Sequence, residues 1–366
     1  MFKNIISDTY DESVFNSTPR KIFYGVNNVA KRVKAVYIGS RGLAKKLIYE
    51  FKKDFVFKET IQAAYSTGNI MASNDDYLYQ CDNTNTVCAY DDQFTYSELE
   101  IVATTTASAN RGSSYNEQYV LFGGGRSSQE VTAYDEYNVA TLCNNNLDAP
   151  RGYRNYVGSG NVGDYACFIG GYGQRPQSSA GYWEAISQMD CYDDTLTKTN
   201  ATTNPSYNTK ADKLNDKLYI GGGQNYDTSP NMAIYNTVCI YNSELSRVGT
   251  SALSSSKTGI CTQHTKKHVI FAGGGDSKVD ALDEYYTKTA LNDLLASASS
   301  LLGVSSEGLA IFAGINGNSI ECYDSRLVHS IKEPLSTSKS GIYGGAMFKD
   351  KATFTGAGTI DIYEFV

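Results

Sequence analysis

The sequence predicts an all-β protein in which seven four-stranded sheets close into a β-propeller, preceded by a small β-meander arm. The 366-residue chain is rich in residues typical of strands and turns, including 29 Tyr and 33 Gly. A short apolar run that ends in glycines recurs along it, and an apolar segment ending in Tyr and an acid follows each copy. The copies lie 40 to 58 residues apart, enough for four short strands and their turns.

The glycine repeat has four clear copies and two weaker ones. The clear copies end at residues 123–125, 170–171, 221–223 and 273–274, and the weaker ones end at Gly314 and Gly356. Glycine is expected where the backbone turns sharply and neighbouring chains approach closely. The glycines should therefore mark the end of one strand in each sheet.

The Tyr-acid repeat has seven copies, and it sets the number of blades. Its anchor positions are Tyr90, Tyr134, Tyr192, Tyr241, Leu282, Tyr323 and Tyr363. A twisted four-stranded sheet has two apolar faces and is stable only between two like sheets, so the ring must close. Six blades are the alternative, because the first unit lacks glycines at residues 77–81.

An apolar run, a Gly pair and a later Tyr-Asp resemble the kelch repeat, and the resemblance covers residues 62–366. It implies a kelch-like propeller. The Trp usual in the fourth strand of that family is absent, and the single Trp183 is expected in the loop 174–183. The domain assignment is an arm at 1–52 and a propeller at 53–366. Residues 54–61 should supply the fourth strand of the last blade and so remove two exposed sheet edges.

The arm contains a second, shorter repeat and a basic excess. Residues 22–33 align with 36–47 at an offset of 14, with turn dipeptides at 27–28 and 41–42, which predicts about three strands. Such a module is too small for its own core, so it should pack on a partner. Residues 1–54 hold 11 Lys and Arg against 5 acids, whereas the remainder holds 21 against 34. A basic arm on an acidic body suggests docking and display.

The arm repeat resembles short modules of tail and baseplate-associated proteins of tailed bacteriophages and related phage-derived particles. That resemblance implies a virion component assembled in the host cytoplasm. Its partners would be other tail or baseplate proteins, and the docking residues would be Lys31, Arg32, Arg41, Lys45 and Lys46. The acidic body argues against nucleic-acid binding. No apolar run reaches the roughly 18 residues of a membrane span, and no signal peptide is expected.

Basic residues recur near the start of the first strand in five units. They are Arg111, Arg151, Lys210, Lys257 and Lys339. One hypothesis is that they surround the mouth of the central channel and bind an acidic ligand, such as a carboxylated or phosphorylated glycan. The alternative is that each pairs with an acid of its own or the next blade, and the candidate acids are Asp91, Asp135, Asp193 and Asp324.

Tyrosines in the variable stretches suggest a sugar-binding or protein-binding face. They are Tyr153, Tyr156, Tyr172, Tyr182, Tyr226, Tyr285 and Tyr286. Trp183 is either a ligand contact or a staple that holds its own loop.

Catalytic motifs are absent: there is no P-loop, GxSxG or HExxH, and neither a cofactor nor a metal is expected. His264 and His268 should lie in a hairpin turn, since a metal site would need a third ligand. The eight Cys contain no CxxC pair and are expected to be unpaired, buried and in a reducing compartment.

The sequence therefore predicts a non-enzymatic phage tail or baseplate protein whose propeller binds a host-surface glycan or protein. One alternative is an intracellular kelch scaffold that recruits a protein partner. Another is a carbohydrate-active enzyme, which would need carboxylates or histidines clustered at one end of the channel.

Overall fold

The computed structural model divides the chain into two compact units, Met1–Asp54 with Val366, and Phe55–Phe365. In the first unit it describes the backbone of residues 23–26, 29–32, 35–38 and 46–50. In the second unit the described residues are 55–66, 70–82, 86–100, 111–125, 128–149, 153–174, 183–204, 206–225, 233–299, 301–306, 308–339 and 344–365.

The described strands of the first unit form two hairpins. β1 (Phe23–Val26) pairs with β2 (Val29–Arg32), and β3 (Ala35–Ile38) pairs with β4 (Lys46–Glu50). The prediction of one meander of about three strands is wrong, because the described strands form two separate hairpins, and β4 extends past the second copy of the repeat. Val26 lies opposite Val29, and the turn dipeptide predicted at 27–28 lies outside the described residues. Lys31 and Arg32 belong to β2 and Lys46 to β4, while Arg41 and Lys45 lie outside the described residues.

The second unit consists of seven four-stranded antiparallel sheets. The innermost strands are β6 (Ile70–Ser73), β10 (Gly112–Tyr115), β14 (Gly158–Val162), β20 (Lys210–Leu214), β26 (Ile260–His264), β30 (Leu302–Ser305) and β34 (Gly345–Phe348). The second strands are β7 (Leu78–Cys81), β11 (Val120–Gly123), β15 (Tyr165–Ile169), β21 (Lys217–Gly221), β27 (Val269–Gly273), β31 (Leu309–Ile315) and β35 (Lys351–Gly356). The third strands are β8 (Val87–Tyr90), β12 (Val131–Tyr134), β18 (Gln188–Tyr192), β24 (Thr237–Asn242), β28 (Asp280–Leu282), β32 (Ser319–Asp324) and β36 (Thr359–Phe365). The outermost strands are β9 (Tyr96–Glu98), β13 (Ala140–Leu142), β19 (Lys198–Thr202), β25 (Arg247–Ala252), β29 (Lys288–Ala290), β33 (His329–Lys332) and β5 (Phe55–Gln62).

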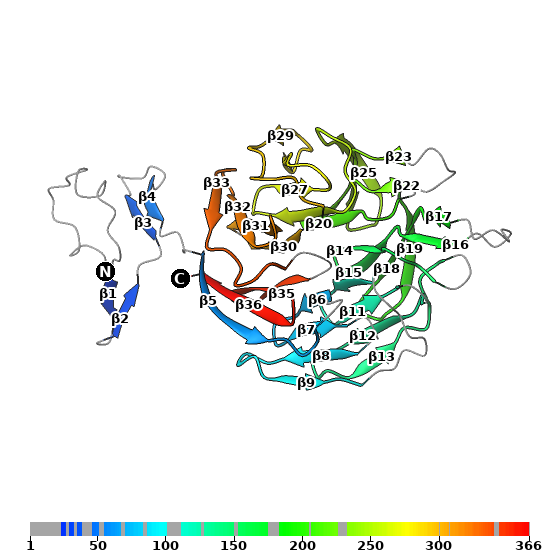
Figure 1. The fold of residues 1–366 in the computed structure, drawn as a ribbon, viewed down its shortest axis with the longest axis horizontal. Coiled ribbons are helices and arrows are strands. Elements are labelled where there is room, and N and C mark those ends of the chain that lie inside the picture. Colours follow the sequence, from blue (N-terminus) through cyan, green and yellow to red (C-terminus); the bar gives the residue numbers. More distant parts are fainter. Residues whose placement is uncertain are drawn as a thin grey trace. The chain divides into compact units, whose positions relative to one another are not determined.

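These sheets are the blades of a seven-bladed β-propeller, as the repeat predicted. Each innermost strand contacts the innermost strand of the next blade, and β34 contacts β6, so the ring is closed. Figure 1 shows the innermost strands towards the middle of the propeller, with β9, β13, β29 and β33 at its edge. Blade 7 takes its outermost strand from the other end of the chain. β5 pairs antiparallel with β36, from Phe55 opposite Phe365 to Gln62 opposite Thr359.

The core lies between the blades. The described residues form seven buried apolar clusters, and each cluster is shared by two neighbouring blades. Between blades 3 and 4, for example, Cys167 and Ile169 of β15 pack with Leu218 and Ile220 of β21. No blade thus buries its two faces alone, which is the physical reason for the closed ring.

The Tyr-acid repeat performs two separate tasks. The buried Tyr fixes the loop that enters its blade: Tyr192 Oη donates to Asn145 O at 2.5 Å, and Tyr323 Oη donates to Asn292 O at 2.7 Å. The acid that follows closes the hairpin to the outermost strand. Asp193 Oδ1 accepts hydrogen bonds from the amides of residues 195 and 197. The same turn forms at Asp91, Asp135, Asp283 and Asp324.

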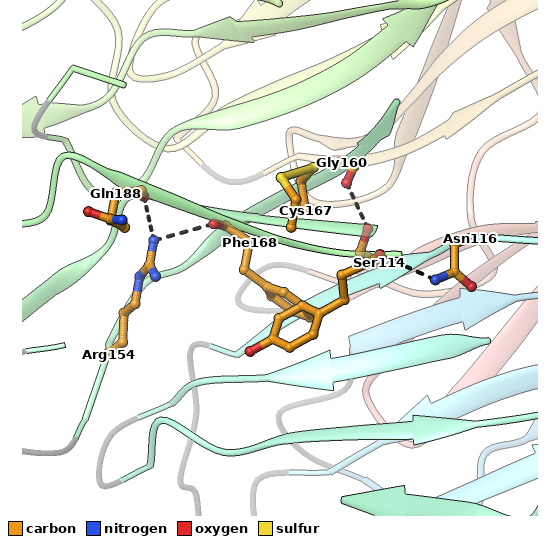
Figure 2. The surroundings of a disulfide bond; sticks show 9 residues. Ser114, Asn116, Arg154, Gly160, Cys167, Phe168 and Gln188 are labelled. Atoms are coloured by element: carbon orange, nitrogen blue, oxygen red, sulfur yellow. Dashed lines mark hydrogen bonds between the residues drawn. A yellow bond between two sulfur atoms is a disulfide. The ribbon is translucent and has the colours of Figure 1, made fainter. Parts of the chain in front are cut away.

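One disulfide joins two strands of blade 3. Cys167 on β15 lies directly opposite Cys191 on β18, and the two sulfurs are bonded (Figure 2). The expectation of eight unpaired cysteines is wrong for this pair. It considered equivalent positions in different blades, whereas these residues face each other within one blade. Cysteines 81, 88, 143, 239, 261 and 322 are free and buried.

Blades 3 and 4 carry additional hairpins between their second and third strands. β16 (Tyr172–Gln174) pairs with β17 (Trp183–Ala185), and β22 (Gln224–Asn225) pairs with β23 (Ala233–Ile234). Trp183 begins β17 opposite Gln174, so the loop expected at 174–183 ends in a strand. The described residues contain no helix that is long and apolar enough to cross a membrane.

Candidate functional site

Two of the five predicted basic residues are buried inside their own blades. Lys257 Nζ donates to Gly273 O at 3.0 Å and to Lys278 O at 2.8 Å, and it forms an ion pair with Asp276. Lys339 Nζ donates to Gly356 O at 3.1 Å and lies 3.5 Å from Asp361 Oδ2. Both ammonium groups therefore brace the glycine turn of their blade. Lys257 and Lys339 thus each pair with an acid of their own blade, as the alternative predicted. The acids are Asp276 and Asp361, which are not among the four that the sequence suggested.

Arg154 plays this part in blade 3, and the sequence reading missed it. The side chain is fully buried, and Nε donates to Gly170 O at 2.5 Å. Nη2 donates to Gln188 O at 2.5 Å (Figure 2). Nη1 pairs with the buried carboxylate of Asp190. Burial lowers the pKa of Arg154 and raises the pKa of Asp190, since each charged form loses water, and their attraction offsets part of this cost.

The other three predicted residues lie in different settings. Arg111 is buried, and its Nη1 lies 3.5 Å from Cys81 Sγ. Arg151 lies outside the described residues. Lys210 is the first residue of β20 and is exposed to solvent. Protein groups crowd its ammonium, and this partial desolvation lowers its pKa although the side chain remains accessible.

A polar cluster lies at the other end of the innermost strands. It consists of Asp212 on β20, Gln263 and His264 on β26, and Ser305 on β30, and we call it the channel cluster. Ser305 Oγ lies 2.6 Å from both Asp212 Oδ2 and Gln263 Oε1. It also accepts a hydrogen bond from the amide of His264 at 2.8 Å. Asp212 of β20 and Ser305 of β30 are in contact although β26 lies between their two strands in the ring. This contact therefore lies on the channel side of β26.

Asp212 and His264 form an ion pair within the channel cluster. Nδ1 of His264 lies 2.9 Å from Oδ1 of Asp212, although the angle is poor for a hydrogen bond. Desolvation lowers the pKa of His264, but the Asp212 charge outweighs this effect and the net pKa is raised. The expectation that His264 lies in a surface turn is wrong: it ends β26, and the turn begins at Thr265.

We expect Asp212→Asn to lower the pKa of His264, because burial then acts on the imidazole without the compensating charge. In the native protein the pair stabilises the fold fully below the ordinary His pKa and is lost as pH rises through the raised one. NMR titration of the imidazole protons measures the pKa of His264 in the native protein and in the variant. His268, whose pKa burial lowers, is the internal control and should titrate unchanged. An unchanged His264 pKa in the variant would contradict the pairing.

Three tyrosines meet at the opposite face, where the loops enter blades 3 and 4. We call Tyr156, Tyr172 and Tyr207 the tyrosine platform. The rings of Tyr156 and Tyr172 are stacked with centroids 5.4 Å apart, and Tyr172 meets Tyr207 edge-on at 5.0 Å. Tyr207 is buried beneath its two half-exposed neighbours. Of the other tyrosines predicted for a binding face, Tyr285 is 78% exposed elsewhere, and Tyr182 and Tyr226 lie outside the described residues.

Two shallow depressions lie around the loop at 144–149 that enters blade 3, and the smaller one also includes Ala185, which pairs with Tyr172. One of about 500 Å³ is lined by Asn144, Asp148 and Lys198 among others, and one of about 360 Å³ shares Asp148. Lys198 Nζ is 2.6 Å from Asp148 Oδ1, so the charges there satisfy each other. Within the described part of the chain, no group of three or more His, Cys, Asp or Glu could hold a metal ion.

No protein-family model matches the chain, and no curated protein matches it. Solved structures do match. A streptogramin B lyase is 11% identical with a TM-score of 0.59, and the match covers 85% of this chain and 98% of the lyase. Selenomethionine-substituted virginiamycin B lyase from Staphylococcus aureus is 12% identical with a TM-score of 0.60, and the match covers 86% and 100% of the two chains. The catalytically inactive form of that lyase was solved with quinupristin.

Another structure, YjhT, is 14% identical with a TM-score of 0.50, and the match covers 69% of this chain and 92% of YjhT. At these identities the likeness shows the fold alone, a seven-bladed β-propeller. These matches support neither the kelch resemblance nor the phage-tail resemblance.

Proposed function

We propose that this chain is a non-enzymatic structural component at the tail or baseplate of a phage-type particle. Residues 1–52 dock on other particle proteins, and the propeller is displayed for recognition of a glycan or protein on the host surface. The observation that carries the proposal is the closure of the ring by β5. All seven blades are complete from residue 55 onward, so the propeller does not need the preceding residues for its fold.

The charge distribution supports the same division of roles. The first unit has a net excess of basic residues, whereas the propeller is acidic. Lys31, Arg32 and Lys46 lie on short hairpin strands. Opposite charges on a docking surface would steer such a hairpin unit and fix its position.

Particle incorporation tests the docking role. We expect Lys31→Glu with Arg32→Glu to lower co-sedimentation of the full chain with particles about tenfold, since losing two charge contacts costs about 1.4 kcal/mol. The matched control is Lys266→Glu with Lys267→Glu, two exposed lysines in the β26–β27 turn of the propeller. Equal incorporation of both variants, or no co-sedimentation of the unaltered chain, would contradict docking through the arm. Recovery with a cellular protein instead would favour the intracellular scaffold.

A second candidate function is acid–base catalysis at the channel. The Asp212–His264 pair favours it, because the nearby carboxylate charge raises the basicity of the imidazole. Quinupristin serves as a probe, since it was solved with a lyase of the same fold. If the propeller serves for display, we expect no turnover of quinupristin. Turnover that disappears in His264→Ala and persists in His268→Ala would replace it with an enzymatic function.

A further inference from the structure

We propose that the tyrosine platform binds a neutral saccharide. This inference rests on the proposed function and gives the host-surface ligand a chemical class and a location. The ring of Tyr156 stacks on Tyr172, so its outer face provides a rigid, partly exposed aromatic surface that Tyr172 and Tyr207 support from behind. The flat apolar face of a sugar ring stacks on such a surface, with little side-chain entropy to lose on binding.

The backbone holds the platform in place from three directions. Residues 155 and 172 exchange two backbone hydrogen bonds, of 3.0 and 2.9 Å, which fix Tyr156 beside Tyr172. Residues 207 and 224 exchange two more, both of 3.0 Å. The side-chain amide of Gln224 also donates to Tyr207 Oη. The rings are therefore preorganised, which reduces the entropic cost of binding.

Tyr156 adopts a backbone conformation that tyrosine seldom takes. Its φ is +51°, in the left-handed region, which is unfavourable for an L-residue with a bulky side chain. Core packing does not require this conformation, because the side chain is half-exposed. This conformation places the ring of Tyr156 in its stacked position on Tyr172.

Asn155 is a second and independent indication of a ligand. It is 3% exposed, and its Oδ1 is buried without a hydrogen-bond partner among the described residues. An unsatisfied buried acceptor is costly, and a hydroxyl donor would satisfy it. Asn155 directly precedes Tyr156, and the backbone of Asn155 pairs with that of Tyr172.

Among the described residues near the platform, the buried cations are already engaged, and this favours a neutral rather than an acidic ligand. The neighbouring Arg154 is fully buried and engaged by Asp190 and by backbone carbonyls. Lys257, in the next blade, is likewise committed to Asp276 and to carbonyl groups. Neither cation is available to recognise a carboxylate or a sulfate, whereas hydroxyl groups and ring faces match what the platform offers.

Binding of the full-length chain to an array of neutral, sialylated and sulfated glycans tests the inference. We expect binding to neutral glycans, lowered about tenfold by Tyr156→Asn and by Tyr172→Ala, since aromatic contacts contribute on this scale. Asparagine tolerates the left-handed conformation, so Tyr156→Asn removes the ring and keeps the loop. Tyr172→Phe retains the ring and should bind normally. Tyr285→Ala removes an equally large exposed ring elsewhere and should also bind normally.

Three results would overturn the inference: no glycan binding, binding restricted to acidic glycans, or binding that Tyr156→Asn and Tyr172→Ala leave unchanged. Thermal unfolding of each variant shows that it is folded. Co-sedimentation with particles depends on the arm and not on the platform. A chain that enters particles but binds no neutral glycan therefore refutes the saccharide site and leaves the docking role intact.

Discussion

Asp190→Ala lowers the free energy of unfolding of the propeller by about 3–5 kcal/mol, because it leaves the buried guanidinium of Arg154 without its carboxylate. Both side chains of this pair are fully buried. Urea unfolding followed by far-UV circular dichroism measures the loss. Asp193→Ala is the matched control, since this neighbouring acid only closes the β18–β19 turn, and we expect a loss of about 1 kcal/mol.

The double variant Arg154→Met with Asp190→Leu separates an unpaired charge from lost packing. Replacing a whole buried ion pair by apolar side chains is often neutral, so we expect most of the stability to return. If Asp190→Ala costs no more than Asp193→Ala, the pair does not brace blade 3. If the double variant is as unstable as Asp190→Ala, the hydrogen bonds to the backbone carry the effect rather than the charges.

Gly170→Ala should destabilise the propeller by about 2–5 kcal/mol, from two causes that act together. Gly170 has a φ of +57°, which disfavours any side chain, and an added Cβ would overlap the carbonyl oxygen of Ser206. Gly275→Ala is the control. Its φ is also positive, at +99°, but nothing lies within 4 Å of an added Cβ, so only the backbone term of about 1–2 kcal/mol applies.

The same urea titration compares these two glycine variants. Equal losses would mean that close approach of the loop that enters blade 4 does not explain why glycine occupies position 170. A larger loss at Gly170 supports the view that the repeated glycines give neighbouring blades room to meet.

The propeller could be predicted because its evidence recurs. All seven blades share the strand pattern, and most share a glycine at the same turn and a Tyr that fixes the same loop, so weak signals reinforce one another even though blade 1 lacks the glycine and blade 5 has Leu282. The unit of the arm repeat was harder to predict. A 14-residue period fits both a strand-and-turn meander and a self-closed hairpin, and only the pairing of β1 with β2 decides between them.

The functional groups could not be predicted in the same way, because they do not occupy equivalent positions of the repeat. Asp212, His264 and Ser305 are the third, fifth and fourth residues of their strands, and only the ring brings them together. Arg154 was missed for a related reason. The recurrence of basic residues near the start of the first strand pointed to Arg151, but the residue three positions later reaches the glycine turn. Partners of buried charges depend on geometry that alignment of the repeats does not contain.

The pairing of β5 with β36 has a consequence for biosynthesis. β5 is the first strand of the propeller to be made, but its pairing partner β36 is made about 300 residues later. During translation, blades 1 to 6 can form in order, while β5 stays unpaired until β36 has been made. Loop closure over so long a separation is slow. The newly made chain therefore passes through an open, aggregation-prone intermediate, and rapid release of its C-terminus or chaperone protection of β5 should raise the yield of folded protein.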